Sequence, residues 1–117
     1  MTREEMKMRT KRYANRVVKL CQALPNNWVA KTLGAQLLRS ATSVGANYRA
    51  VCRARSKAEF VARMGIVVEE ADEAILWLEL LTESGMAPKE KTQELLSEAK
   101  ELTAIFTASQ QTARGAA

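Results

Sequence analysis

An unbroken apolar seam in the second half of the chain constrains the fold more than any other feature of the sequence. Its positions alternate by four and three residues: Phe60, Met64, Val67, Ala71, Ala74, Leu78 and Leu81. This spacing is a heptad repeat, which places all of these side chains on one face of one long helix. Additional apolar residues, among them Trp77 and Leu80, widen that face beyond the seam. The segment therefore predicts a helix with more than one neighbour, and Trp77 and Leu80 are candidates for an interface with another subunit.

Three other segments show helical periodicity between recognisable boundary residues. Thr2 and Glu5 form a T-x-x-E capping box at the start of the first segment, and Pro25 disfavours helix in the residue before it. Asn27 suits the N-cap of the second segment, and Pro88 suits the first turn of the last. The expected helices span residues 3–24, 28–54, 57–84 and 88–112. Short links between amphipathic helices predict an all-α, antiparallel up-down-up-down four-helix bundle that forms one domain over residues 1–117.

The second expected helix is rich in small residues and carries an amide in its interior. Gly, Ala and Ser are frequent between residues 34 and 46, and small residues favour the close approach of another backbone. Asn47 lies mid-helix, where an amide is unfavourable unless it finds a hydrogen-bond partner. We predict a buried polar node in which Ser43 and Gln36 are partners of Asn47 and fix the packing register. A functional amide at Asn47 is the alternative.

Charge is distributed unevenly along the chain. Residues 1–60 contain 13 Lys and Arg against three Asp and Glu, whereas residues 61–117 contain five against ten. The candidate phosphate-binding residues recur at helical spacing: Arg9, Arg12, Arg16, Lys19, Arg49, Arg53, Arg55 and Lys57. Antiparallel packing of the first two helices would concentrate these cations, and such a patch suits a polyanion such as RNA or DNA. Pairing with the carboxylates of the second half is the alternative.

The sequence lacks the residues on which most catalytic and metal sites depend. It contains no histidine, which is the commonest general base and transition-metal ligand. It has no glycine-rich phosphate loop either. The acidic group of Glu69, Glu70, Asp72 and Glu73 lacks the Glu-x-x-His motifs of a di-metal bundle. We therefore expect no enzyme activity, no cofactor and no metal.

Features of the termini and cysteines bear on the compartment. No segment approaches the roughly 18 uncharged apolar residues of a membrane span, and residues 1–12 are charged without the apolar core of a secretory signal. Antiparallel packing would hold Cys21 and Cys52 far apart, so we expect free thiols, as in a reducing compartment. The expectation is a cytoplasmic protein with no membrane partner.

Part of this pattern is similar to that of a known family. The matching residues are Gln36, Arg39-Ser40-Ala41, Ser43-Val44, Ala46-Asn47, Arg55-Ser56, Glu59-Phe60 and Trp77-Leu78-Glu79-Leu80-Leu81. They resemble the small bacterial four-helix bundle proteins known as S23 or 23S-rRNA intervening-sequence proteins. The resemblance implies a bundle that assembles into a homo-oligomer, a closed pentameric ring, and some relatives are encoded inside insertions in the large ribosomal RNA gene. A more distant likeness is to the accessory protein of diversity-generating retroelements, which works with a reverse transcriptase and RNA.

Two functional hypotheses follow. The first is a non-enzymatic, oligomeric bundle that binds structured RNA or DNA through backbone phosphates, because no module for reading bases is visible. The second is a protein-interaction scaffold that docks an acidic protein or a nucleic-acid enzyme such as a reverse transcriptase. Trp77 and Tyr48 are candidates either for base stacking or for core and interface packing. Arg39 and Arg55 are candidates either for phosphate binding or for ion pairs with carboxylates of the third helix.

Overall fold

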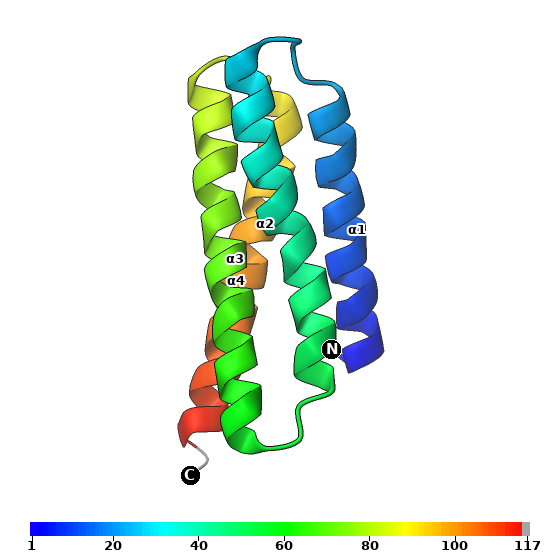
Figure 1. The fold of residues 1–117 in the computed structure, drawn as a ribbon, viewed down its shortest axis with the longest axis vertical. Coiled ribbons are helices and arrows are strands. Elements are labelled where there is room, and N and C mark those ends of the chain that lie inside the picture. The colour runs from blue at the N-terminus through cyan, green and yellow to red at the C-terminus, as the bar shows by residue number, and fades with distance from the viewer. Residues whose placement is uncertain (116–117) are drawn as a thin grey trace.

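The computed structural model describes residues 1–115 as four α-helices. These are α1 (Arg3–Gln22), α2 (Trp28–Cys52), α3 (Lys57–Glu83) and α4 (Lys89–Gly115), and no strand occurs in this part of the chain. Consecutive helices run in opposite directions and form an elongated bundle of 48 × 23 × 21 Å (Figure 1). The predicted all-α four-helix bundle is confirmed, and the last two residues of the predicted domain lie outside the described range.

Side-chain caps explain where three of the helices begin. The Thr2 hydroxyl, the Asn27 side-chain oxygen and the Ser56 hydroxyl each accept a hydrogen bond from the N–H three residues later, at 2.8–3.1 Å. Each cap satisfies an N–H group that the first turn of a helix leaves without an intrahelical partner. After α3 the chain reverses through Gly85, whose φ of +79° is readily adopted only without a Cβ atom.

The helix ends differ slightly from the prediction. α1 and α2 each end two residues early, because the following N–H groups bond to carbonyls three residues back, which tightens the last turn. α4 continues to Gly115 instead of ending at residue 112. Near its end the Gln110 side-chain amide donates to the Val61 carbonyl of α3 at 3.0 Å, which holds the last turns of α4 against its neighbour.

All four helices contribute to one aliphatic core. Six of the seven seam positions of α3 are buried, and only Phe60 is partly exposed. Across from the seam lie the large buried side chains of the other helices: Tyr13, Val17, Leu37, Val44, Leu102 and Phe106. Replacing one of the fully buried leucines by alanine removes apolar contact and leaves a cavity, at a cost of about 2–5 kcal/mol.

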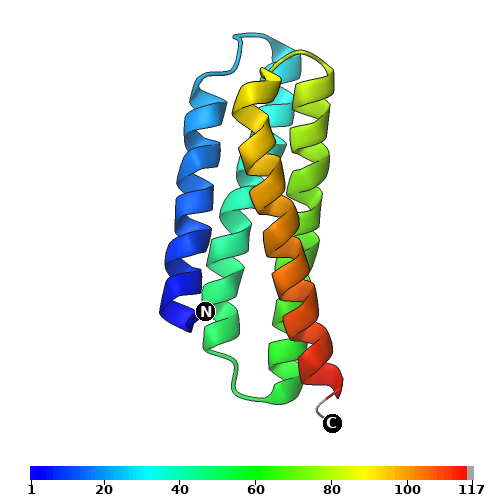
Figure 2. The same ribbon diagram turned by 180° about the vertical axis from the view of Figure 1, so that it is seen from behind.

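α1 packs closely on only one neighbour. It lies along α2, whereas its approach to α4 is sparse (Figure 2). Two glycines of α2 permit the close approach: a Cβ atom at Gly34 would lie 2.7 Å from Leu24 Cδ1, and one at Gly45 would lie 3.3 Å from Thr10 Oγ1. The side of α1 that faces α4 is joined to it largely by charged side chains, and this difference between the two sides decides which cations remain available at the surface.

Candidate nucleic-acid interface

Two of the predicted phosphate-binding residues, Arg9 and Arg16, are engaged by carboxylates of α4. The Arg9 guanidinium donates to Glu98 from Nε at 2.8 Å and from Nη2 at 2.7 Å, and only 16% and 17% of the two side chains are exposed. Arg9 also lies 3.0 Å from Glu101, and Arg16 lies 3.3 Å from Glu94. The hydrogen bond to Glu98 is the main reason that the pKa of Arg9 is raised. The charge of Arg9 is therefore compensated inside the bundle, whereas the Arg16–Glu94 pair lies at the surface, with 37% and 85% of the two side chains exposed.

Four more of the predicted cations are exposed to solvent. Arg12 and Lys19 of α1, with Arg55 and Lys57 at the turn between α2 and α3, make no salt bridge within residues 1–115. The backbone N–H of Arg55 donates to the Glu59 carboxylate at 3.1 Å, and this bond lowers the pKa of Glu59. The Arg55 side chain stays in solvent.

Arg49 of α2 and Arg53, the residue that caps the C-terminal end of α2, line a groove together with Lys7 and Lys11 of α1. We call these four residues the groove cluster. The two lysines were not predicted, because they lie on the side of α1 that faces α2 and so fall outside the stripe of Arg9, Arg12, Arg16 and Lys19. A usable signal was present: each helix carries two cations four residues apart, and antiparallel packing can place two such pairs side by side. Of the eight predicted residues, the structure thus brings only Arg49 and Arg53 into this groove, while Arg16 and Lys19 line a separate hollow beside Glu90 and Glu94.

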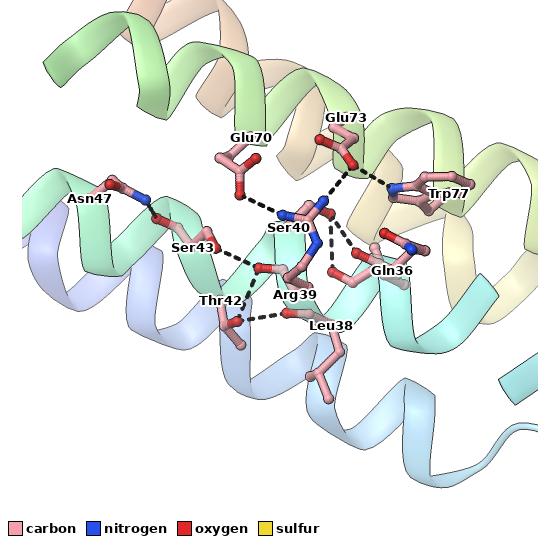
Figure 3. Close-up of polar contacts among 11 residues, drawn as sticks. Gln36, Leu38, Arg39, Ser40, Thr42, Ser43, Asn47, Glu70, Glu73 and Trp77 are labelled. Carbon is pink, nitrogen blue, oxygen red and sulfur yellow. Dashed lines mark hydrogen bonds and ion pairs between the residues drawn. The ribbon is translucent and has the colours of Figure 1, made fainter. Parts of the chain in front are cut away.

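A second polar surface runs between α2 and α3, where Arg39 binds two carboxylates. Its Nη2 donates to Glu73 at 2.6 Å and its Nη1 to Glu70 at 3.4 Å, while the Trp77 indole N–H donates to the same Glu73 oxygen at 3.3 Å (Figure 3). Arg39 therefore makes the ion pairs that were one of its two predicted roles. The arrangement ties α2 to α3 and leaves Arg39 with little uncompensated charge.

The predicted polar node of Gln36, Ser43 and Asn47 is a row of hydrogen bonds along α2, not a buried network. The Asn47 amide donates to the Ser43 backbone carbonyl at 2.8 Å, and the Ser43 hydroxyl donates to the Arg39 carbonyl at 2.7 Å (Figure 3). Gln36 contributes its backbone carbonyl, which accepts from the Ser40 hydroxyl at 3.0 Å. The three predicted residues are half-buried and the buried one is Ser40. The reason is local, since such side chains in a helix readily reach a carbonyl one turn earlier.

α3 exposes large apolar side chains on the surface beside this row. Ile66 is 46% exposed, Leu76 48% and Leu80 37%. Trp77 is half-buried and packs against the core. Of the two predicted interface residues, Leu80 therefore lies at the surface and Trp77 lies between the surface and the core.

The two tyrosines belong to the core. Tyr48 is 8% exposed, and its ring centroid lies 5.5 Å from that of Phe106, so its predicted packing role applies and its ring is not presented for base stacking. Burial raises the pKa of Tyr48 to about 12. Tyr13 is more deeply buried, and within the described residues its hydroxyl has no hydrogen-bond partner. Burial also raises the pKa of Tyr13.

Among residues 1–115, no group of three or more His, Cys, Asp or Glu side chains is arranged to hold a metal ion. No helix in that range contains an apolar stretch long enough to cross a membrane. Cys21 and Cys52 are free thiols, and burial raises the pKa of Cys21.

Comparison with known proteins identifies the family. Residues 4–108 match the sequence profile described as "23S rRNA-intervening sequence protein". The chain belongs to this family. It is similar to a protein with unknown function from the S23 ribosomal protein family of Bacteroides thetaiotaomicron, whose crystal structure was determined at 1.70 Å. The two share 30% identity with a TM-score of 0.86, over 95% of this chain and 99% of that chain. No curated protein matches this chain.

Membership of the 23S rRNA-intervening sequence protein family confirms the resemblance seen in the sequence. Of the residues that carried the resemblance, Arg39 joins α2 to α3 through Glu73. Ser43 and Asn47 bond to carbonyls of their own helix, α2, and Trp77 bonds to Glu73 within α3. The groove cluster lies outside the residues of the resemblance, so it is the structure that draws attention to it.

Proposed function

We propose that this protein is a non-enzymatic homo-oligomer that binds structured RNA or DNA through backbone phosphates in the cytoplasm. Its family is named for the intervening sequence of 23S ribosomal RNA, and the chain has a net charge of +5. Proteins that bind nucleic acid without reading its sequence do so chiefly by placing Lys and Arg against phosphates.

The distribution of uncompensated charge is the observation that carries this proposal. Carboxylates of α3 and α4 engage Arg9, Arg16 and Arg39. Within residues 1–115 most cations without a salt bridge lie on α1, on α2 or at the turn into α3: Arg3, Lys11, Arg12, Lys19, Lys31, Arg49, Arg53, Arg55 and Lys57. The bundle therefore has one side of net positive charge, which attracts a polyanion.

The apolar face of α3 supports self-association. Ile66, Leu76 and Leu80 are exposed on one helix, with the half-buried Trp77 beside them. Leu76 and Leu80 lie about one turn apart on α3, and neighbouring exposed apolar side chains of this kind can mark a site where another protein surface packs. We propose that Trp77 and Leu80 contribute to the interface of a ring, with a pentamer as the expected size. A ring repeats the positive side in every subunit, so several weak phosphate contacts would act together on one polyanion.

Fluorescence anisotropy with a labelled RNA hairpin and a duplex DNA tests the proposal. We expect tight binding at 50 mM salt and little difference between hairpins of the same shape and different sequence. With about six phosphates contacted, the slope of log affinity against log salt should be near −5 on duplex DNA. No detectable binding to either probe at 50 mM salt would overturn the proposal. Capture of an acidic protein through the same cations would then favour the scaffold function.

Two charge-reversal variants provide the matched comparison. One replaces Arg12, Lys19, Arg49 and Arg53 by Glu, and the other replaces Lys89, Lys91, Lys100 and Arg114 of α4 by Glu. The residues in both sets are exposed and the change in net charge is the same. We expect the first variant to lose binding and the second to retain it within about tenfold, because none of the four α4 cations lines the groove that holds Arg49 and Arg53. Equal loss in both would show that binding depends only on net charge.

A further inference from the structure

The groove between the first half of α1 and the second half of α2 combines a hollow with a concentration of cations. It has a volume of about 390 Å³. Its sides carry the groove cluster of Lys7, Lys11, Arg49 and Arg53. Its remaining lining residues are small or short: Thr10, Ala14, Thr42, Gly45 and Ala46. Charged side chains therefore surround a floor from which no long side chain rises to fill the space.

The two helices are in close contact beneath the groove, so the groove is shallow and its floor is continuous. A Cβ atom at Gly45 would lie 3.3 Å from Thr10 Oγ1, so the helices touch at this point. The Thr10 hydroxyl bonds to carbonyls of its own helix, Met6 at 3.0 Å and Lys7 at 3.1 Å. The Thr10 hydroxyl therefore needs no hydrogen-bond partner from a ligand. A ligand in the groove is recognised by the cations alone.

The four cations are almost free of protein counter-charge. Within residues 1–115, Lys11, Arg49 and Arg53 form no salt bridge, and Lys7 pairs only with Glu4, whose side chain is 81% exposed. An exposed pair of that kind contributes little and exchanges readily with another anion. Arg9, also on α1, differs because Glu98 and Glu101 hold it from α4.

The spacing of the cations suits a linear polyanion. On each helix the two cations are four residues apart, which is about 6 Å along the helix axis. The two pairs run along opposite sides of one groove, so an anion chain lying in it meets positive charge on both sides. Arginine can form two parallel hydrogen bonds to one phosphate, whereas lysine acts as a point charge. No aromatic side chain lines the groove, so stacking of bases has no part in recognition there.

We infer that this groove is the seat of a phosphodiester backbone, with successive phosphates held between Lys7 and Lys11 of α1 and Arg49 and Arg53 at the C-terminal end of α2. The inference rests on the proposed function and assigns it to one place. The same chemistry is offered by a single strand and by one strand of a duplex. Binding in the groove is indifferent to base sequence, because every phosphate presents the same oxygens.

A pair of charge-neutralised variants tests the assignment. K11Q/R49Q/R53Q removes one lysine and two arginines from the groove, and K100Q/R63Q/R114Q removes the same charges from exposed positions on α3 and α4. The probes are a labelled 20-nucleotide oligouridylate and a 20-base-pair RNA duplex. We expect the groove variant to lose at least about 30-fold in affinity, and its salt slope on the single strand to become shallower by about 2. The matched variant should change by less than about fivefold.

A steric variant tests the same groove without changing charge. Ala46 is exposed on the lining, so A46Q places a longer neutral side chain in the hollow, and A108Q makes the same change on the exposed surface of α4. We expect A46Q to weaken binding at least about fivefold and A108Q to leave it unchanged. Circular dichroism should show the same helix content in all of these variants.

The outcomes distinguish a failure of the proposed function from a failure of the groove assignment. If the wild-type protein does not bind either probe at 50 mM salt, the proposed function is wrong and the groove assignment goes with it. If the wild type binds but both charge variants weaken binding equally, and A46Q has no effect, the groove assignment is wrong while the proposed function stands. Loss in the groove variant and in A46Q alone supports the assignment. The probe that shows the larger loss identifies whether the groove prefers a single strand or a duplex.

Discussion

The Arg9–Glu98 pair tests whether an arginine that is paired within the bundle stabilises the fold and contributes little to nucleic-acid binding. R9Q removes two hydrogen bonds of 2.7 and 2.8 Å and leaves Glu98, 17% exposed, without its partner. Exposed pairs contribute about 0–1 kcal/mol, whereas breaking a buried pair costs about 3–5 kcal/mol. With one-sixth of each side chain exposed, we expect a loss of about 2 kcal/mol, in the range for hydrogen bonds to charged groups. The contact to Glu101 adds little, because that side chain is 62% exposed.

Urea unfolding followed by circular dichroism measures this cost. At an m-value of about 2 kcal/mol/M, a loss of 2 kcal/mol lowers the unfolding midpoint by about 1 M. R12Q is the control, since an exposed residue without a salt bridge should change stability by less than about 0.5 kcal/mol. All variants must be compared at one protein concentration, because the proposed assembly would make stability depend on it.

A double-mutant cycle shows whether the cost comes from the pair itself. We expect R9Q, E98Q and the double variant to give a coupling energy of about 1.5 kcal/mol. R9Q should also leave affinity for nucleic acid within about threefold of wild type, because its charge is compensated by α4. Additive effects, a cost below about 0.5 kcal/mol, or a loss of affinity equal to that of R49Q would each refute the reasoning.

Three further predictions follow from single side chains. Tyr13→Phe should leave thermal stability unchanged or raise it by about 1 kcal/mol, because the buried hydroxyl has no partner; a loss above 1 kcal/mol would reveal one. Glu59 has a lowered pKa, so its stabilising effect is present above the unfolded pKa of about 4.3 and disappears as pH falls through the folded value; the difference in urea midpoint between wild type and E59Q should therefore be larger at pH 7 than at pH 3. Leu80→Asp should reduce the mass measured by light scattering while circular dichroism stays helical, and an unchanged mass would remove Leu80 from the interface.

Most of the fold could be predicted because its signals are local. The seam of α3 and the caps at Thr2 and Asn27 each act within a few residues, and the structure has them where the sequence places them. The ends of α1 and α2 were predicted less well, because tightening of the last turn leaves no strong signal in residue type.

The candidate site was predicted only in part, because charge spacing does not tell which neighbour a helix face meets. Arg9 and Arg16 form a regular stripe with Arg12 and Lys19, yet Arg9 and Arg16 face carboxylates that are far away in the sequence. Lys7 lies about 200° from Arg9 around α1, at 100° per residue, which is the side toward α2. Only the tertiary arrangement distinguishes a compensated arginine from an available lysine. Asn47 bonds to its predicted partner Ser43, but it does so through the backbone carbonyl one turn earlier in its own helix and not in a buried network.

Lysine footprinting tests the central claim most directly, because every chain carries its own controls. The wild-type protein is acetylated briefly with and without a saturating single-stranded RNA at 50 mM salt, and modification of each lysine is measured by mass spectrometry. Lys7 and Lys11 line the groove, whereas Lys89, Lys91 and Lys100 lie exposed on α4. The account predicts that RNA protects Lys7 and Lys11 at least about fivefold and leaves the three α4 lysines unprotected. Equal protection of all five, or protection confined to α4, would contradict it.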